Sequence, residues 1–285
     1  MFLKVLTFWG VLMTQLKLLK STLLVAMTLL LSSCQQYQIQ PIDPIHSFHE
    51  VGFASIEPGT LVIFDVDETL IQPVDTYLIN EHTQMAKDFK KGFFQNHPEV
   101  KNWDELGEIM LVEAKRPLLE PMISNEVRDL KNRGIVVIAC TGMNTGAYGK
   151  IKSLEEWRYS HLKSLGFEAS IGNLVFTLKG FKGTPGFYKG ILSTDLEPKG
   201  LVLGAVFDRI GLHPQKVVMI DDTLEGALYS VQKECEKRGI PFQGYQYKGF
   251  KEKPWDEALV QFQGDYLIKH KKWLSDIDAR KISKL

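Results

Sequence analysis

Two aspartates, one residue apart, follow directly after a strongly apolar run of the chain. The run covers residues 61–64 (Leu-Val-Ile-Phe), and Asp65 and Asp67 come next, with Thr69 two residues further on. An apolar run of this kind is typical of a buried strand, so both carboxylates are expected to emerge where the strand stops. The pair marks a place for chemistry rather than for packing.

Two later apolar runs end in polar residues in the same way. Residues 135–139 lead into Thr141, and residues 216–220 lead into Asp221 and Asp222. Because these runs alternate with helical segments, they predict a parallel sheet, whose ligands bind at the carboxyl ends of the strands. The polar residues are therefore expected to gather at one edge of the sheet.

A cation is expected among these carboxylates, because four aspartates in one place repel one another without it. The seven histidines of the chain are scattered without ligand spacing, so the ligands are hard oxygen atoms. Oxygen ligands in small number favour Mg²⁺, which keeps several waters and bridges to a phosphate. The sequence predicts a magnesium-dependent site for a phosphorylated small molecule.

Taken in order along residues 61–247, the motifs resemble those of the haloacid dehalogenase superfamily of phosphohydrolases. They are Asp65-Val66-Asp67-Glu68-Thr69, Thr141, a lysine and Asp221-Asp222. Within that superfamily, residues 241–247 and 273–276 resemble an uncharacterised bacterial family of unknown function. The resemblance implies a Rossmann-like α/β fold, in three α/β/α layers around a parallel sheet, with a small helical cap inserted.

The resemblance also implies a role for each motif residue. Asp65 is the nucleophile that forms an aspartyl-phosphate, and Asp67 is the acid and then the base for the two steps. Thr141 and the backbone beside Gly142 bind a phosphoryl oxygen; a plain strand-end turn is the alternative for Thr141. An acid at position 67 favours phosphatases and phosphomutases over the dehalogenase and phosphonatase members.

Four lysines precede the last motif, namely Lys179, Lys182, Lys189 and Lys199. We select Lys199, because it begins the helix directly before the 216–220 strand, where the superfamily's lysine usually lies. It would neutralise the phosphate and the nucleophile together, while the other three are expected to be solvated charges.

For the metal, the resemblance implies Asp221, the carboxylate of Asp65 and the main-chain carbonyl of Asp67. Asp222 is expected to order a metal-bound water or Lys199. Both late aspartates could also cap the helix that follows them, which is compatible with metal binding.

Around these motifs the pattern predicts a helical cap at about 71–133 and a β-hairpin flap near 172–194. The C-terminal stretch 255–284 is predicted to be helical, with Trp273 docked on the body. Cys140 and Cys235 are expected to be free thiols, since nothing in their sequence context supports a disulfide.

The N-terminus is typical of a secretory signal over residues 1–33, with lysines before a short apolar run. The run ends in Leu31-Ser32-Ser33-Cys34, which resembles a bacterial lipobox with Cys34 as the lipidated residue. Residues 34–44 then form a tether, and Gln35 favours the periplasmic face of the outer membrane. An uncleaved membrane anchor is the alternative, and translation could start at Met1 or at Met13.

Composition sets few further limits. Basic and acidic residues are equal at 34 each, so no positive field favours nucleic acid. The sequence as a whole predicts a lipid-anchored, Mg²⁺-dependent phosphomonoesterase of the bacterial cell envelope, with a folded domain over 45–285 and no prediction of its oligomeric state. The alternatives are a phosphotransferase or phosphomutase of the same fold, and a surface-binding lipoprotein without turnover.

Overall fold

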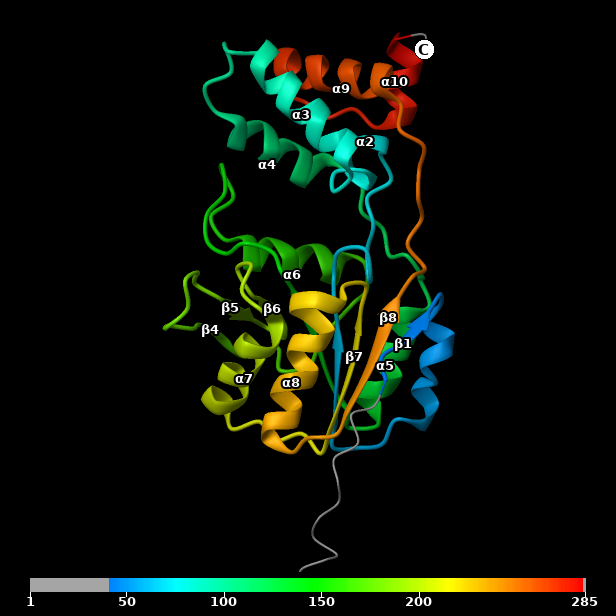
Figure 1. The fold of residues 1–285 in the computed structure, drawn as a ribbon, viewed down its shortest axis with the longest axis vertical. Helices are drawn as coiled ribbons and strands as arrows, with labels where there is room; N and C mark the ends of the chain where they lie inside the picture. Colours follow the sequence, from blue (N-terminus) through cyan, green and yellow to red (C-terminus); the bar gives the residue numbers. More distant parts are fainter. Residues whose placement is uncertain (1–40, 284–285) are drawn as a thin grey trace, which may run out of the picture. The chain divides into compact units, whose positions relative to one another are not determined.

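An eight-stranded sheet forms the centre of the structure, a computed structural model that describes residues 41–283 (Figure 1). The strand order is β1-β8-β7-β2-β3-β6-β5-β4. The first six strands in this order, which end with β6, are all parallel to their neighbours. The strands are β1 (Asp43–Ile45), β2 (Thr60–Phe64), β3 (Val136–Thr141), β4 (Val175–Thr177), β5 (Gly186–Tyr188), β6 (Ile191–Ser193), β7 (Lys216–Asp221) and β8 (Phe242–Tyr247). The protein has the α/β fold that its sequence predicts.

Strand β2 shows how the sheet separates two hydrophobic layers, because side chains alternate between the faces of a strand. Val62 and Phe64 lie in one core cluster, and Leu61 and Ile63 lie in the other. The first cluster includes residues of η1 (Phe48–Val51), η2 (Phe53–Ser55), α5 (Ile123–Asn132) and α6 (Leu154–Ser164). The second includes residues of α7 (Lys199–Ile210), η3 (Leu224–Leu228) and α8 (Tyr229–Arg238).

The short strand β1 differs from the predicted tether. Asp43 and Pro44 were expected in the tether, yet they pair in parallel with Tyr245 and Gln246 of β8. Pro44 fits there because β1 is the edge strand, where a residue without an N–H group costs no internal ladder bond. Three residues at a sheet edge carry too little pattern to be recognised in the sequence.

The predicted hairpin is present, but it extends the sheet. β4 and β5 pair antiparallel, as do β5 and β6, and β6 pairs in parallel with β3. Gly190, at a φ of 88°, makes the tight turn between β5 and β6. Ser193 therefore ends β6 beside Thr141 of β3, at the edge of the sheet that carries the aspartates.

The cap is built from two separate parts of the chain. Helices α2 (Thr76–Ile79), α3 (Gln84–Asn96) and α4 (Trp103–Glu113) follow β2, and α9 (Glu257–His270) and α10 (Asp276–Ser283) follow β8. Figure 1 shows these helices gathered together beyond one end of the strands. Trp273 packs with Leu78 and Leu106 of the cap, and its indole N–H donates to Asp75 at 2.9 Å. Trp273 thus docks on the cap and not on the body.

Helix α5 packs on the sheet, although the sequence interpretation placed it in the 71–133 cap. Its buried residues Ile123, Val127 and Leu130 pack in the cluster that contains Val62 and Phe64 of β2. The inserted part of the cap therefore ends before α5, which belongs to the layer of the sheet. A polar helix with one apolar stripe has the same sequence pattern whether it lies in a cap or against a sheet.

Other sequence-based predictions have mixed outcomes. Cys140 and Cys235 are free, as expected, and both are buried. The signal, Cys34 and Gln35 lie outside the described residues. Within residues 41–283 no helix is long and apolar enough to cross a membrane.

Candidate active site

Asp65, Lys199 and Asp221 form a buried ionic cluster at the ends of three elements. The Lys199 ammonium donates to Asp65 Oδ1 at 2.5 Å and to Asp221 Oδ2 at 2.6 Å. Asp65 follows β2, Asp221 ends the adjacent β7, and Lys199 is the first residue of α7. Their side chains are between 1% and 9% exposed. The structure therefore brings together the three residues whose contact the sequence could only anticipate.

The cluster carries more negative charge than its lysine balances. Burial raises the pKa of Asp65 to about 7, Asp221 adds repulsion, and Lys199 opposes both. Burial likewise raises the pKa of Asp221, and it raises that of Asp222 to about 6 with help from Asp65. Burial opposes the charge of Lys199, but the two aspartates outweigh it and raise its pKa. A second cation would relieve this repulsion.

Asp67 lies in a more open environment. It lines the same polar cleft as Asp65, Lys199 and Asp221, and its side chain is 49% exposed. Directly after it, Glu68 adopts a φ of 63°, which is unusual for a residue other than glycine. The Glu68 N–H donates to Ile71 O at 2.8 Å and closes the chain into a tight turn. The turn leaves Asp65 buried beside Lys199 and Asp67 facing solvent, so the two carboxylates can do different work.

Thr141 connects Asp67 to the next strand. Its hydroxyl donates to Asp67 Oδ2 at 3.3 Å and accepts from the Met143 N–H at 3.2 Å. Gly142 lies between Thr141 and Met143 in the chain, and a Cβ added to Gly142 would meet no atom within 4 Å. The space beside Gly142 is therefore open to the cleft, as a phosphoryl-binding backbone requires.

Asp222 is anchored by threonines. Thr69 Oγ1 accepts from the Asp222 N–H at 3.1 Å and donates to Asp222 Oδ1 at 3.4 Å. Thr223 Oγ1 donates to Asp222 Oδ2 at 3.2 Å. The described structure records no hydrogen bond between the side chains of Asp222 and Lys199, so the expected contact with Lys199 is not formed. Neither aspartate is the N-cap of the helix that follows, because the N-cap of η3 is Thr223, whose side chain makes no capping bond. The Thr223 N–H donates to Asp221 Oδ1 at 2.9 Å.

The carboxylates fit a hard divalent cation. Asp65, Asp221 and Asp222 each offer an oxygen atom, and these atoms lie within 4.8 Å of one another. No histidine or cysteine of the described chain belongs to this group. An all-oxygen donor set is the chemistry that suits Mg²⁺.

Arg158 is a residue that sequence reasoning missed. It lies on α6, is 3% exposed, and its Nη2 lies 3.0 Å from both carboxylate oxygens of Asp67. Its Nε and Nη1 atoms are buried without a hydrogen-bond partner among the described residues. Nothing in the sequence signals this contact, because 91 residues separate the pair. We infer that Arg158 holds Asp67 in position at the cleft.

Given the acid role that the resemblance implies for Asp67, Arg158→Met should lower kcat/KM, which reports the first chemical step, by about 10–100-fold for esters of ordinary alcohols, since a misplaced catalytic group costs rates of this order. The loss should be smaller for an aryl phosphate, whose leaving oxygen needs no proton from Asp67. Steady-state kinetics with both ester types measure the difference. Equal losses on both would mean that Arg158 acts only on folding.

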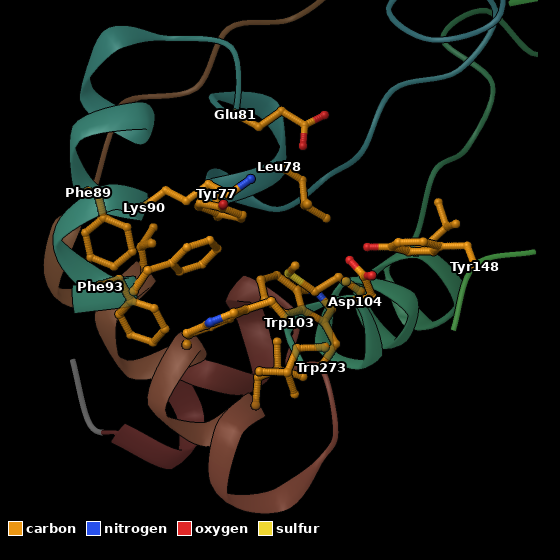
Figure 2. A pocket seen from close by; sticks show the side chains of 18 of the residues that line it. Tyr77, Leu78, Glu81, Phe89, Lys90, Phe93, Trp103, Asp104, Tyr148 and Trp273 are labelled. Carbon is orange, nitrogen blue, oxygen red and sulfur yellow. The ribbon is translucent and has the colours of Figure 1, made fainter. Parts of the chain in front are cut away.

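A cavity of about 490 Å³ adjoins the cleft at Asp67 and extends into the cap (Figure 2). Asp67, Met143 and Arg158 line it from the body, and side chains of α2, α3, α4 and α9 line it from the cap. The polar cleft with Lys199 and the aspartates also includes Asp67 and Met143. Asp67 thus lies where the cleft and the cavity meet.

The fold and site define an α/β protein with an acidic candidate active site at the carboxyl ends of its central strands. The chain belongs to the family described as "Protein of unknown function (DUF2608)", which matches residues 44–280. An uncharacterised protein of Rickettsia bellii is 24% identical over 231 residues, 75% of this chain and 77% of that protein. Uncharacterised proteins of Rickettsia felis and Rickettsia prowazekii are 29% and 30% identical over 47% of this chain and 48% of their own.

Two solved structures resemble the chain distantly. DsGPDH of Dunaliella salina matches at a TM-score of 0.34 and 14% identity, over 75% of this chain and 28% of that one. A HAD family enzyme of Bacteroides thetaiotaomicron, solved with magnesium and inorganic phosphate, matches at a TM-score of 0.29 and 13% identity, over 70% and 98%. Both TM-scores are below 0.5.

Proposed function

We propose that the protein is a Mg²⁺-dependent phosphomonoester hydrolase of the haloacid dehalogenase type, acting through an aspartyl-phosphate. The observation that carries the proposal is the contact of Lys199 with both Asp65 and Asp221, beside the exposed Asp67. Asp65, a buried carboxylate paired with the Lys199 ammonium, would supply the nucleophile of such a reaction. Asp67, an accessible carboxylate two residues away, would carry the proton.

In the first step, an oxygen of Asp65 bonds to phosphorus as the bond from phosphorus to the ester oxygen breaks. Asp67 gives its proton to the departing oxygen, which leaves as an alcohol. In the second step, water attacks phosphorus, Asp67 takes its proton, and the bond between phosphorus and Asp65 breaks. Inorganic phosphate leaves and both carboxylates return to their starting states.

The other residues act on charge and position. Lys199 neutralises the transferring group together with Asp65, and the Thr141 hydroxyl and the backbone at Gly142 bind a phosphoryl oxygen. Asp65, Asp221 and the main-chain carbonyl of Asp67 would hold Mg²⁺, and Asp222 would orient one of its waters. When bound, Mg²⁺ supplies positive charge to the phosphoryl oxygens.

Phosphate release from a small aryl phosphate tests the proposed activity. We expect turnover with Mg²⁺ and none with a chelator, with activity restored by excess Mg²⁺. Added glycerol distinguishes hydrolysis from transfer, because a phosphotransferase would form glycerol phosphate in place of inorganic phosphate. Turnover that is unchanged in the chelator, or absent with Mg²⁺, would contradict the proposal.

Metal binding should also change stability in a pH-dependent way. The pKa values of Asp65 (about 7) and Asp222 (about 6) lie above the ordinary value of 3.8. Between these values the folded chain binds protons that the unfolded chain does not, so the metal-free protein gains stability as the pH falls from about 8 to about 5. Mg²⁺ competes with those protons, so its stabilisation is lost over the same range.

At a hundredfold excess over its dissociation constant, Mg²⁺ should stabilise the protein by about 2.7 kcal/mol, or roughly 5–10 °C in Tm, at about pH 8. At about pH 5 the shift should be close to zero. Thermal unfolding with NaCl at matched ionic strength as the control measures both. A shift of the same size at the two pH values would show that Mg²⁺ binds elsewhere.

We also propose that the mature protein is anchored in the bacterial envelope by a lipid on Cys34, with Gln35 directing it to the outer membrane. Cys34→Ser should move the protein from the membrane to the soluble envelope fraction, as measured by fractionation and immunoblotting, with phosphatase activity unchanged. Cys235→Ser is the matched control, because Cys235 is buried in the folded domain. A Cys34→Ser protein that stays fully in the membrane would contradict lipid anchoring.

A further inference from the structure

The cap cavity has an aromatic wall, to which seven of its lining residues contribute. Figure 2 shows Phe89 and Phe93 of α3, Trp103 of α4, and Trp273 turned toward the same space. The rings also contact one another: Phe93 and Trp103 lie 6.2 Å apart between ring centroids, and Phe94 stacks on Trp103 at 3.9 Å. Contacts between rings fix their orientation, so the cavity offers a formed aromatic wall.

The remaining wall is aliphatic and closely fitted. Met110, Leu267 and Ile268 line it from α4 and α9. Gly264 of α9 faces the Phe93 ring, where an added Cβ would lie 2.6 Å from a ring carbon. A glycine at this position lets α9 approach α3 and close that side of the cavity.

The body closes another side through the loop that follows Thr141. Tyr148 of this loop lies against Gly107 of α4, where an added Cβ would clash with the Tyr148 hydroxyl. Beside it, the Lys150 N–H donates to Glu108 Oε2 at 2.7 Å. The loop that begins at the phosphoryl-binding residues therefore also bounds the cavity, which places the two spaces next to each other.

Charged groups around the cavity balance one another. Its cations are Lys90, Arg116 and Arg158, and its anions are Asp67, Glu81 and Asp104. A wall without net charge does not favour a second ionic group on the ligand. On the aromatic and aliphatic part of the wall, a sugar would bury hydroxyls against groups that cannot hydrogen-bond with them.

We propose that the cavity binds the alcohol part of the substrate, and that this part is an uncharged, mainly apolar body carrying a flat ring. The assignment rests on the proposed phosphatase function, because Asp67 joins the cavity to the phosphoryl cleft. Its volume of about 490 Å³ is within the range of sites for ligands of drug size. The substrate class is thus a phosphate monoester of a hydrophobic, ring-bearing alcohol.

The test compares phosphate esters of primary alcohols, whose leaving groups react similarly. With Mg²⁺, kcat/KM for 2-(2-naphthyl)ethyl phosphate should exceed that for ethyl phosphate and glycerol 1-phosphate by about 100-fold or more, since each buried CH₂ group favours binding. Trp103→Ala should lower kcat/KM about tenfold for the naphthyl ester and less than about twofold for ethyl phosphate. Tyr266→Ala is the control, because Tyr266 lies on α9 outside the cavity lining. It should leave kcat/KM unchanged for both the naphthyl ester and ethyl phosphate.

A binding measurement separates the cavity from catalysis. Naphthylethanol should quench the tryptophan fluorescence of the wild-type protein and bind at least about tenfold more weakly to Trp103→Ala. Phe94→Ala, which removes a ring that is 37% exposed, gives a second variant if Trp103→Ala does not fold.

The outcomes are distinguishable. Equal or better turnover of ethyl phosphate, glycerol 1-phosphate or a nucleoside 5′-monophosphate would overturn the apolar substrate class and leave the phosphatase function intact. Failure to hydrolyse any ester with Mg²⁺ would overturn the proposed function, and the substrate class with it.

Discussion

Asp65→Asn is expected to reduce kcat by about 10⁴-fold or more, the scale on which enzymes lose activity with their nucleophile. Asparagine has nearly the same shape as aspartate, so it preserves the packing of a side chain that is 7% exposed. What it removes is the carboxylate oxygen that would bond to phosphorus and the negative charge that pairs with Lys199. Initial rates of phosphate release, with circular dichroism as the check on folding, measure the effect.

Asp208→Asn is the matched control for this variant. Asp208 lies on α7, the helix that Lys199 begins, but it pairs with Arg238 away from the cleft. Its replacement should leave the rate unchanged within about twofold, as is usual for an exposed site away from the chemistry. Turnover by Asp65→Asn at more than a few per cent of the wild-type rate would exclude Asp65 as the nucleophile.

Lys199→Met is expected to damage both stability and activity. It leaves Asp65 and Asp221 buried without their counter-charge, and breaking a buried pair in this way costs about 3–5 kcal/mol. The loss of free energy of unfolding should be largest near pH 8 without metal. It should shrink toward pH 5, because Asp65, whose pKa is already raised, then takes up a proton.

The activity of Lys199→Met should fall by about 100–1,000-fold, as when a charge-stabilising group is removed from a transition state. Lys182→Met is the control, since Lys182 is an exposed lysine of the β4–β5 loop that the sequence also offered for this role. Chemical denaturation at the two pH values and steady-state kinetics give both results. A variant as stable as the wild type at pH 8 would show that Lys199 does not balance the aspartates.

Much of the candidate site could be predicted because its residues are tied to strand ends. Asp65 and Asp221 follow apolar runs that form adjacent parallel strands, and parallel strands place their carboxyl ends at one edge. Lys199 could be selected because it begins a helix beside the last of these strands. Local pattern and sheet geometry together were sufficient for these positions.

Arg158 and Thr69 could not be assigned their contacts in the same way. Arg158 lies mid-helix on α6, and Thr69 is a fully buried residue that bonds to Asp222, 153 residues away. Such contacts depend on which face of an element meets a neighbour. Periodicity in one sequence identifies a buried face but not its partner.

The limits of the cap were mispredicted for a related reason. α3 and α4 could be recognised as helices, but α9 and α10 join them only through distant contacts, such as Thr76 with Asp276 across 200 residues. α5, in contrast, has the same kind of amphipathic pattern and packs on the sheet. An apolar stripe on a helix does not say which layer it covers.

The central claim, that Asp65 carries the phosphoryl group, is tested most directly by trapping the intermediate. Asp67→Asn should react with an aryl phosphate, whose leaving oxygen needs no acid, and then hydrolyse slowly because no base activates water. Rapid acid quenching and peptide mass spectrometry should find close to one phosphoryl group per protein on Asp65 when Mg²⁺ is present, and none in Asp65→Asn. Turnover without phosphoryl-Asp65 in Asp67→Asn, or a phosphoryl group on another residue, would contradict the account.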